Sequence, residues 1–354
     1  EFPQEASYTG RIIHPQHWPE NLNYAGKKVV VIGSGATAVT IVPVMAEKAE
    51  KVYMLQRTPT YMVSRPAKDW LANTLRAILP EMMAYKITRW RNITMQRFAY
   101  NMARNKPQKM SKRLLDMARK MLPADYPNFE KDFQPPYTPW EQRLCLVPDA
   151  DMFNAISSGK AEVVTDHIDH FTPTGIKLKS GRELEADIVV SATGLNLVMM
   201  GKTNLSIDGR ATAPSEHVSY KGMMFNDIPN FASVFGYVNA SWTLKTDIVA
   251  DYVCRLLKTM DAKGVQIANP HLADADMPRL PWVDDFSSGY FARSFDKLPK
   301  NGDRHPWRVL QDYKAEKKIL TEEPIEDGIM LFSKAGEMVK PLEANAQPML
   351  EAAE

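Results

Sequence analysis

The 354-residue sequence has little cysteine, little net charge and no long uninterrupted hydrophobic run. Its two cysteines, Cys145 and Cys254, lie far apart, which excludes a disulfide framework and favours a reducing, cytoplasmic compartment. Lys and Arg number 44 against 42 Asp and Glu, and this balance gives no general attraction to nucleic acid or membranes. The longest apolar stretch, residues 29–45, is interrupted by Gly, Ser, Thr and Pro, whereas a membrane span needs roughly 20 apolar residues.

What is present is a globular composition, with 44% hydrophobic and 24% charged residues over a length typical of two or three domains. Residues 27–50 predict a buried strand, a glycine turn and a helix that Pro43 kinks or ends. Residues 51–57 predict a second strand. This order is the first half of a βαβ unit and predicts an α/β fold with a parallel sheet.

The turn between the first strand and the helix carries a dinucleotide fingerprint. Gly33-Ser34-Gly35-Ala-Thr37-Ala38 fits the spacing G-x-G-x-x-A. Gly33 permits the tight turn, Gly35 lets the backbone approach a pyrophosphate, and Ala38 allows close helix–strand packing. The N–H groups at the helix start then face the phosphates, so we expect a nucleotide site here rather than a purely structural turn.

The end of the second strand indicates which nucleotide is bound. An NAD site usually has Asp or Glu near this position, for the ribose 2′-hydroxyl. This sequence has Arg57-Thr58, and a guanidinium suits a 2′-phosphate. The sequence therefore favours NADP(H). The alternative is that Arg57 is a solvent-facing charge at a strand end.

The segment 67–123 has a different character. It has thirteen Lys and Arg against three acidic residues and predicts a helical insertion. One apolar stripe at helical spacing is expected from Leu71, Leu75, Ile78 and Met82. The basic face is interpreted as solvated, with contact to an anionic surface as the alternative. Residues 125–138, rich in Pro and aromatics, are expected to form a linker.

Strand signals return afterwards. Residues 161–168 and 186–194 predict strands, and Ser180-Gly181 marks a hairpin turn. Another buried strand is expected at 230–237, and an amphipathic helix at 242–260. Two further groups contain residue types that occur in chemical sites. The run Asp-His-Ile-Asp-His at 166–170 is interpreted as solvated rather than metal-binding, and Cys145 as a buried thiol.

The segment before the first strand has a second motif, with Tyr8, Gly10, His14 and Trp18-Pro19 at fixed spacing. Taken alone, His14 is an ordinary loop histidine, and a metal pair with His17 lacks a third ligand nearby. The spacing resembles the fingerprint of the Baeyer–Villiger flavin monooxygenases, with Tyr8 where Phe is usual. Trp18-Pro19 favours this branch over the related flavin-containing N- and S-oxygenases.

The resemblance extends from Tyr8 to about Arg308 through the segments SGATAVT, LQRTPTY, WEQRLCLVP, ADIVVSATGLN, YKGMM and GYVNASWTLK. Within the family it is strongest to the ethionamide-activating type of actinobacteria. It implies a flavoprotein with two dinucleotide-binding domains. Residues 1–26 would be an interdomain linker, 27–66 and 140–194 a Rossmann-like NADP domain, 67–139 a helical insertion, and 195–354 the C-terminal part of the FAD domain.

The resemblance also implies a chemistry. NADPH reduces FAD, and the reduced flavin activates dioxygen to convert ketones into esters or lactones or to oxygenate sulfur compounds. Arg143 corresponds to the arginine whose charge stabilises the anion formed during oxygen transfer, although a structural ion pair is the alternative. Gly194, in the Ala-Thr-Gly motif, permits close approach to the cofactors, and residues 239–245 open a helix beside the flavin. The expected partners are these small molecules and dioxygen, with no metal and no nucleic acid.

The family has two glycine fingerprints, and the first of them, for FAD, precedes the Tyr8 motif. This sequence has one, assigned to NADP, and does not begin with Met, so a truncated chain is expected. Two alternatives therefore stay open. The chain alone is an NADPH-binding module without redox chemistry, or the parent enzyme is a flavin-containing S- or N-oxygenase.

Overall fold

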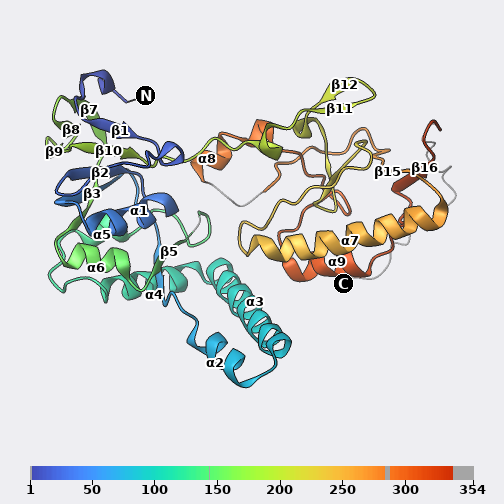
Figure 1. Cartoon of the computed structure of the whole chain (residues 1–354), viewed down its shortest axis with the longest axis horizontal. Helices are drawn as coiled ribbons and strands as arrows, with labels where there is room; N and C mark the ends of the chain where they lie inside the picture. Colours follow the sequence, from blue (N-terminus) through green and yellow to red (C-terminus); the bar gives the residue numbers. More distant parts are fainter. Residues whose placement is uncertain (1, 143, 284–287, 338–354) are drawn as a thin grey trace. The chain divides into compact units, whose positions relative to one another are not determined.

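The computed structural model describes residues 2–142, 144–283 and 288–337, and the chain divides into two compact units, Glu1–Leu195 and Asn196–Glu354 (Figure 1). The strands of the first unit are β1 (Arg11–Ile13), β2 (Lys28–Ile32), β3 (Lys51–Gln56), β4 (Met62–Arg65), β5 (Cys145–Pro148), β6 (Ala161–Thr165), β7 (Ile168–Thr172), β8 (Gly175–Leu178), β9 (Glu183–Glu185) and β10 (Ile188–Ser191). Its helices are α1 (Ala36–Ala46), α2 (Trp70–Ile78), α3 (Glu81–Asn105), α4 (Pro107–Arg119), α5 (Phe129–Phe133) and α6 (Asp151–Ser157).

The centre of the first unit is a parallel sheet with the strand order β1-β10-β2-β3-β6. The predicted strand–helix–strand is confirmed as β2, α1 and β3, with β3 ending one residue before the expected end. Helix α1 passes through Pro43 and ends at Ala46. The segment 11–13, expected within a linker, forms β1 at the edge of this sheet because its backbone pairs with β10. The α/β class with a parallel sheet is therefore confirmed.

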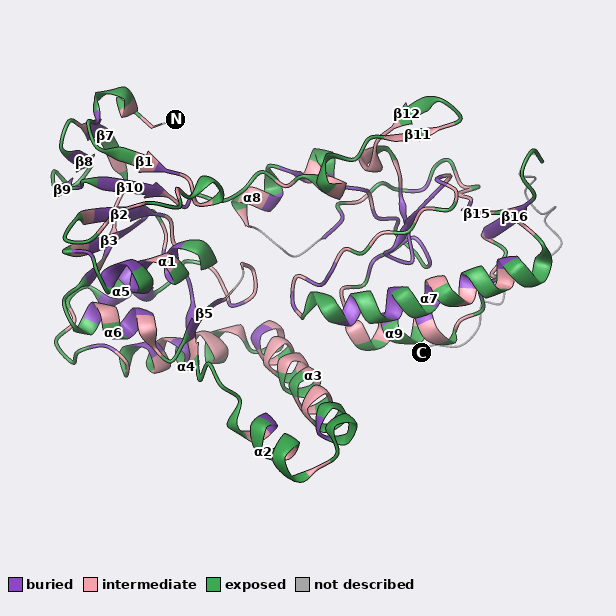
Figure 2. Cartoon of the chain, in the orientation of Figure 1, coloured by how far each residue is buried: buried purple, intermediate pink, exposed green. Residues whose placement is uncertain are grey.

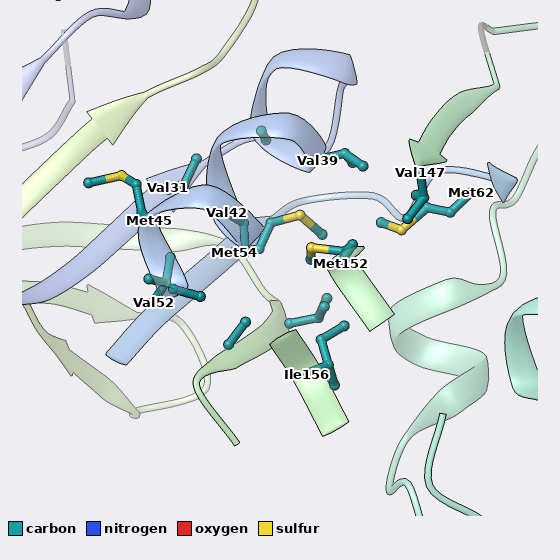
Figure 3. Packing of buried hydrophobic residues seen from close by; sticks show 14 of the residues in the cluster. Val31, Val39, Val42, Met45, Val52, Met54, Met62, Val147, Met152 and Ile156 are labelled. Carbon is teal, nitrogen blue, oxygen red and sulfur yellow. The ribbon is translucent and has the colours of Figure 1, made fainter. Parts of the chain in front are cut away.

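Both faces of the sheet are buried, which explains the unbroken apolar run of β2. Val29 and Val31 belong to the core cluster that includes α1 and α6, whereas Val30 and Ile32 belong to the cluster beneath β7, β8 and β9. The alternation follows from the period of two along a strand. Figure 3 shows Val39 and Val42 of α1 among the packed side chains of the first cluster. The predicted hairpin at Ser180-Gly181 is confirmed between β8 and β9.

The insertion is helical, as predicted, but its apolar stripe is not continuous. Pro80 lies between α2 and α3, so Met82 belongs to a different helix from Leu71 and Leu75. Ile78 is 70% exposed and Met82 61% exposed, so neither packs in a core. The prediction of one stripe on a single helix was wrong because the helical periodicity does not reveal the break between α2 and α3. Figure 2 shows that α2 and α3 are largely exposed or intermediate.

The prediction of a linker at residues 125–138 was also wrong in part. It contains α5, and the side chains of Phe129 and Phe133 are buried in the core of the first unit. Asp132, on the same helix, is buried and bonded to the end of the sheet. The aromatic residues that suggested an irregular segment therefore anchor it.

The second unit contains helices α7 (Trp242–Lys263), α8 (Gly289–Ala292) and α9 (Tyr313–Glu322) and short antiparallel strand pairs. The strands are β11 (Leu205–Ile207), β12 (Arg210–Thr212), β13 (Ser219–Tyr220), β14 (Met224–Phe225), β15 (Ile267–Pro270) and β16 (Met330–Ser333). Helix α7 confirms the predicted amphipathic helix, and Lys245 on it donates to the buried Glu316 of α9 at 2.8 Å. Residues 230–237 form neither strand nor helix, so the prediction of a buried strand there was wrong. In the part of the chain that the structure describes, no helix combines the length and hydrophobicity needed to span a bilayer.

Candidate functional site

The parallel sheet gathers four predicted motifs at one edge. The strands β1, β10, β2 and β3 run in the same direction and in register, so their carboxyl ends meet there. His14 follows β1, Gly33 follows β2, Arg57 follows β3, and Gly194 lies three residues beyond β10. Ligands of parallel α/β sheets bind outside the carboxyl ends of the strands, so this edge is the candidate nucleotide site.

Glycine occupies the two positions of the fingerprint for different structural reasons. Gly33 has a φ of +134°, and a Cβ there would lie 2.3 Å from the backbone oxygen of Ala192. Gly33 is therefore required by the fold itself. Gly35 has an ordinary φ of −76°, and a Cβ there would meet no protein atom within 4 Å. The space beside Gly35 is thus open at the start of α1, where helical N–H groups lack intrahelical acceptors.

A hydrogen bond joins the glycine loop to the exit of β3. The Ser34 hydroxyl donates to the backbone oxygen of Thr58 at 2.8 Å. This bond places the glycine loop beside Arg57, whose side chain is exposed. Thr37 is exposed on the first turn of α1, and Ala38 is fully buried against the sheet, as its packing role requires. The bond between loop and strand exit was not predicted, because Ser34 has no sequence signal for its partner 24 residues away.

A buried polar network anchors the residue before Arg57. The Gln56 amide nitrogen donates to the backbone oxygen of Asp132 and to the Thr165 hydroxyl, both at 2.8 Å. Thr165 donates in turn to the Asp132 carboxylate at 2.7 Å, and the Tyr126 hydroxyl donates to its other oxygen at 3.1 Å. Burial raises the pKa of Asp132 against the opposing effect of these hydrogen bonds. The network fixes the ends of β3 and β6 to α5.

The spacing of Tyr8 and Gly10 has a packing explanation. A Cβ at Gly10 would lie 2.3 Å from the Tyr8 hydroxyl oxygen, so only glycine leaves room for the folded-back ring. The Tyr8 hydroxyl donates to the backbone oxygen of Ala186 at 2.9 Å, and its ring packs edge-on against Phe171. Burial, and then the charge of Asp187, raises the pKa of Tyr8 to about 12. Tyr8 therefore fixes the segment that leads into β1.

The other predicted residues have varied surroundings. His14 begins a short 3-10 helix and accepts a hydrogen bond from the Gln16 backbone at 3.3 Å, while Trp18 is 37% exposed. Among the described residues, no group of three metal-ligating side chains occurs. Cys145 is buried, as predicted, and burial raises the pKa of its thiol to about 11, which keeps it protonated at neutral pH. Gly194 has a φ of +104°, which favours glycine. Arg143 lies outside the described residues.

The parallel sheet, the glycine loop at its carboxyl edge and the helix that follows define a dinucleotide-binding α/β protein. Residues 1–201 match the flavin-binding monooxygenase-like family. With close relatives at more than 45% identity, this match shows that the chain belongs to that family, and the predicted relationship is confirmed.

Two relatives illustrate the match. The chain is 48% identical over 334 residues to the FAD-containing monooxygenase EthA of Mycobacterium tuberculosis, which covers 94% of this chain and 68% of that protein. It is 46% identical over 341 residues to the probable FAD-binding monooxygenase AlmA of Acinetobacter baylyi, with 96% and 68% covered. The chain therefore spans about two thirds of the length of these relatives.

Solved structures of monooxygenases share the fold. An oxidised steroid monooxygenase bound to NADP aligns with a TM-score of 0.69 at 19% identity, over 94% of this chain and 72% of that chain. The complex of OTEMO with FAD and NADP aligns with a TM-score of 0.59 at 20% identity, over 77% of this chain and 60% of that chain. At these identities the likeness concerns the fold.

Proposed function

We propose that this chain supplies the NADP site of an NADPH- and FAD-dependent monooxygenase. The enzyme would insert one oxygen atom of dioxygen into ketones, to give esters or lactones, and would oxygenate sulfur compounds. The observation that carries the proposal is the glycine loop at the carboxyl edge of the sheet, tied by Ser34 to the exit of β3 beside Arg57. The reducing cytoplasm is the proposed compartment, and both cysteines are free.

The residues at this edge fit NADP. The open space at Gly35 admits a pyrophosphate to the N–H groups of the first turn of α1, and Thr37 lies on that turn. Arg57 and Thr58 are proposed to bind the 2′-phosphate, because a guanidinium forms paired hydrogen bonds to phosphate oxygens. Ser34 holds the two subsites at a fixed separation.

FAD enters the proposal through the family, because EthA is an FAD-containing monooxygenase and OTEMO forms a complex with FAD and NADP. When bound, it supplies the reduction and the activation of dioxygen. Gly194, which follows β10 and has a positive φ, is a proposed cofactor-binding residue. In the second unit, the start of α7 is the proposed neighbour of the flavin. We assign residues 1–26 to a linker that contributes β1 to the sheet, and residues 27–66 and 140–194 to the NADP domain. Residues 67–139 are the proposed insertion, and residues 195–354 the proposed part of the FAD domain. Tyr8, Gly10, His14 and Trp18 would couple the two cofactor domains.

Arg143 is the proposed catalytic residue, with its positive charge stabilising the anion that forms as oxygen is transferred. Replacing it should abolish oxygenated product and leave the affinity for NADPH unchanged, because the NADP subsites lie at other residues. Ester formation that survives Arg143→Ala would remove this residue from its role.

The experiment that tests the function begins with the purified chain incubated with FAD and desalted. A retained visible flavin spectrum, followed by NADPH oxidation and an ester from a cyclic ketone, supports the proposal. Sulfoxide from a thioether without ester from the ketone would identify an S-oxygenase instead.

A second candidate is an NADPH-binding module without redox chemistry of its own. The single glycine fingerprint of this sequence favours it. A colourless protein after desalting that still binds NADPH would support this candidate over catalysis by the chain alone.

A further inference from the structure

Helices α2 and α3 expose an unusual amount of large hydrophobic surface. Within the described parts of the chain, half of the eighteen exposed large hydrophobic side chains fall between residues 70 and 98. They are Trp70, Ile78, Met82, Met83, Tyr85, Ile87, Trp90, Met95 and Phe98. Scattered single residues of this kind need no explanation, but a concentration on two helices marks an interaction surface.

Four of these side chains share one face of α3. Met83, Ile87, Trp90 and Phe98 follow one another at steps of four, three and eight residues, which returns each to the same side of a helix. Trp90 is 69% exposed and Phe98 64% exposed. We refer to these four residues as the α3 stripe. Because α3 has 25 residues, it is about 37 Å long at a rise of about 1.5 Å per residue.

The charge around the α3 stripe is mainly positive. Residues 69–106 contain seven Lys and Arg against two acidic residues, Asp69 and Glu81. Lys86, Arg97 and Arg104 are eleven and then seven residues apart, so they form a row along α3 next to the stripe. Lys86 is exposed and lies one turn from Trp90.

The two helices are also fixed to one another. Asp69 caps α2 by accepting from the backbone nitrogen of Ala72 at 3.1 Å, and its carboxylate pairs with Arg91 of α3. The hydrogen bond to Arg91 lowers the pKa of Asp69. Trp70 of α2, which is 71% exposed, is therefore held on the same helical pair as the α3 stripe.

We propose that the α3 stripe and its row of cations dock on the surface of an anionic lipid bilayer, with α3 lying in the plane of the interface. Aromatic side chains with long cationic neighbours match the boundary between headgroups and acyl chains. The excess of one charge sign matches anionic headgroups, whereas an apolar surface for another protein is usually low in charge at its centre. The docking is peripheral, and it goes beyond the proposed NADP chemistry without depending on it.

The test is flotation of the whole chain with lipid vesicles. The chain should float with vesicles that contain phosphatidylglycerol, remain below with pure phosphatidylcholine vesicles, and be released at about 1 M NaCl, where the Debye length is only about 3 Å. Lys86→Glu reverses one charge, so binding should fall about fivefold per unit charge, roughly 25-fold in all. The double variant Trp90→Ser/Phe98→Ser should lower binding roughly tenfold or more, from the apolar area that no longer enters the lipid.

Matched controls are Val44→Ser on α1 and Leu257→Ser on α7, whose side chains are 52% and 53% exposed but lie outside α2 and α3. Both should bind vesicles as the wild type does. All five altered sites are exposed, so thermal unfolding should stay unchanged and a loss of binding would not reflect misfolding. Equal flotation with both lipids, or wild-type binding by Trp90→Ser/Phe98→Ser, would overturn the proposal. A lipid-free dimer in sedimentation velocity that this double variant dissociates would also overturn it, because the surface would then bind a second copy.

Discussion

Replacing Gly35 by Ala separates the needs of the fold from those of the ligand. Its φ of −76° suits alanine, and the new Cβ would contact no protein atom within 4 Å. Alanine restricts the unfolded chain, which is worth about 0.4–1 kcal/mol, but Gly35 is the N-cap of α1, where alanine is disfavoured by a similar amount, so Gly35→Ala should leave the free energy of unfolding nearly unchanged. The same Cβ would lie between the backbone and the pyrophosphate. Losing one charge-assisted hydrogen bond costs about 1.5–3 kcal/mol, so NADPH affinity should fall roughly ten- to hundredfold.

Gly33→Ala is the matched control. Its Cβ would lie 2.3 Å from the backbone oxygen of Ala192, and φ is +134°. The backbone strain alone is about 1–3 kcal/mol, so this variant should lose stability. Urea unfolding measures the free energy of unfolding of both variants, and calorimetric titration measures their affinity for NADPH. Wild-type NADPH affinity in a stable Gly35→Ala protein would refute the close approach of the nucleotide to this loop.

Three further predictions concern other residues. Arg57→Ala should weaken NADPH binding far more than NADH binding, since only NADPH has the 2′-phosphate; equal losses in titration would contradict the assignment. Tyr8→Phe should lower the free energy of unfolding by about 1 kcal/mol through the lost hydrogen bond to Ala186, and no change in urea unfolding would argue against that bond. Burial raises the folded-state pKa of Asp132, so its stabilising contribution is complete at low pH and is lost as pH rises through that pKa. The stability of Asp132→Asn relative to the wild type should therefore increase from about pH 4 to about pH 7, whereas a constant difference would contradict the raised pKa.

The sequence predicted the parts of the fold that local patterns determine. The β-branched run before Gly33 predicted a buried strand, and the fingerprint predicted a tight turn into a helix; both are observed. The structural reasons for Gly33 and Ala38 follow from the same local geometry, because a Cβ at Gly33 would lie 2.3 Å from the backbone oxygen of Ala192 and Ala38 is fully buried in the core.

The features that the sequence did not reveal depend on contacts between distant segments. Helix α5 forms where Pro and aromatic residues suggested a linker, because Phe133 and Asp132 find partners in the sheet. The bond from Ser34 to Thr58 has no local signature. The prediction of one stripe through Ile78 was wrong because the spacing of apolar residues does not reveal the helix break at Pro80.

Calorimetric titration of the wild-type chain with NADPH and NADH is the most direct test that the carboxyl edge of the sheet binds NADP. We expect saturable binding of NADPH, with NADH bound at least roughly tenfold more weakly because it lacks the phosphate that Arg57 is proposed to contact. Absence of NADPH binding, or equal affinity for the two nucleotides, would contradict it.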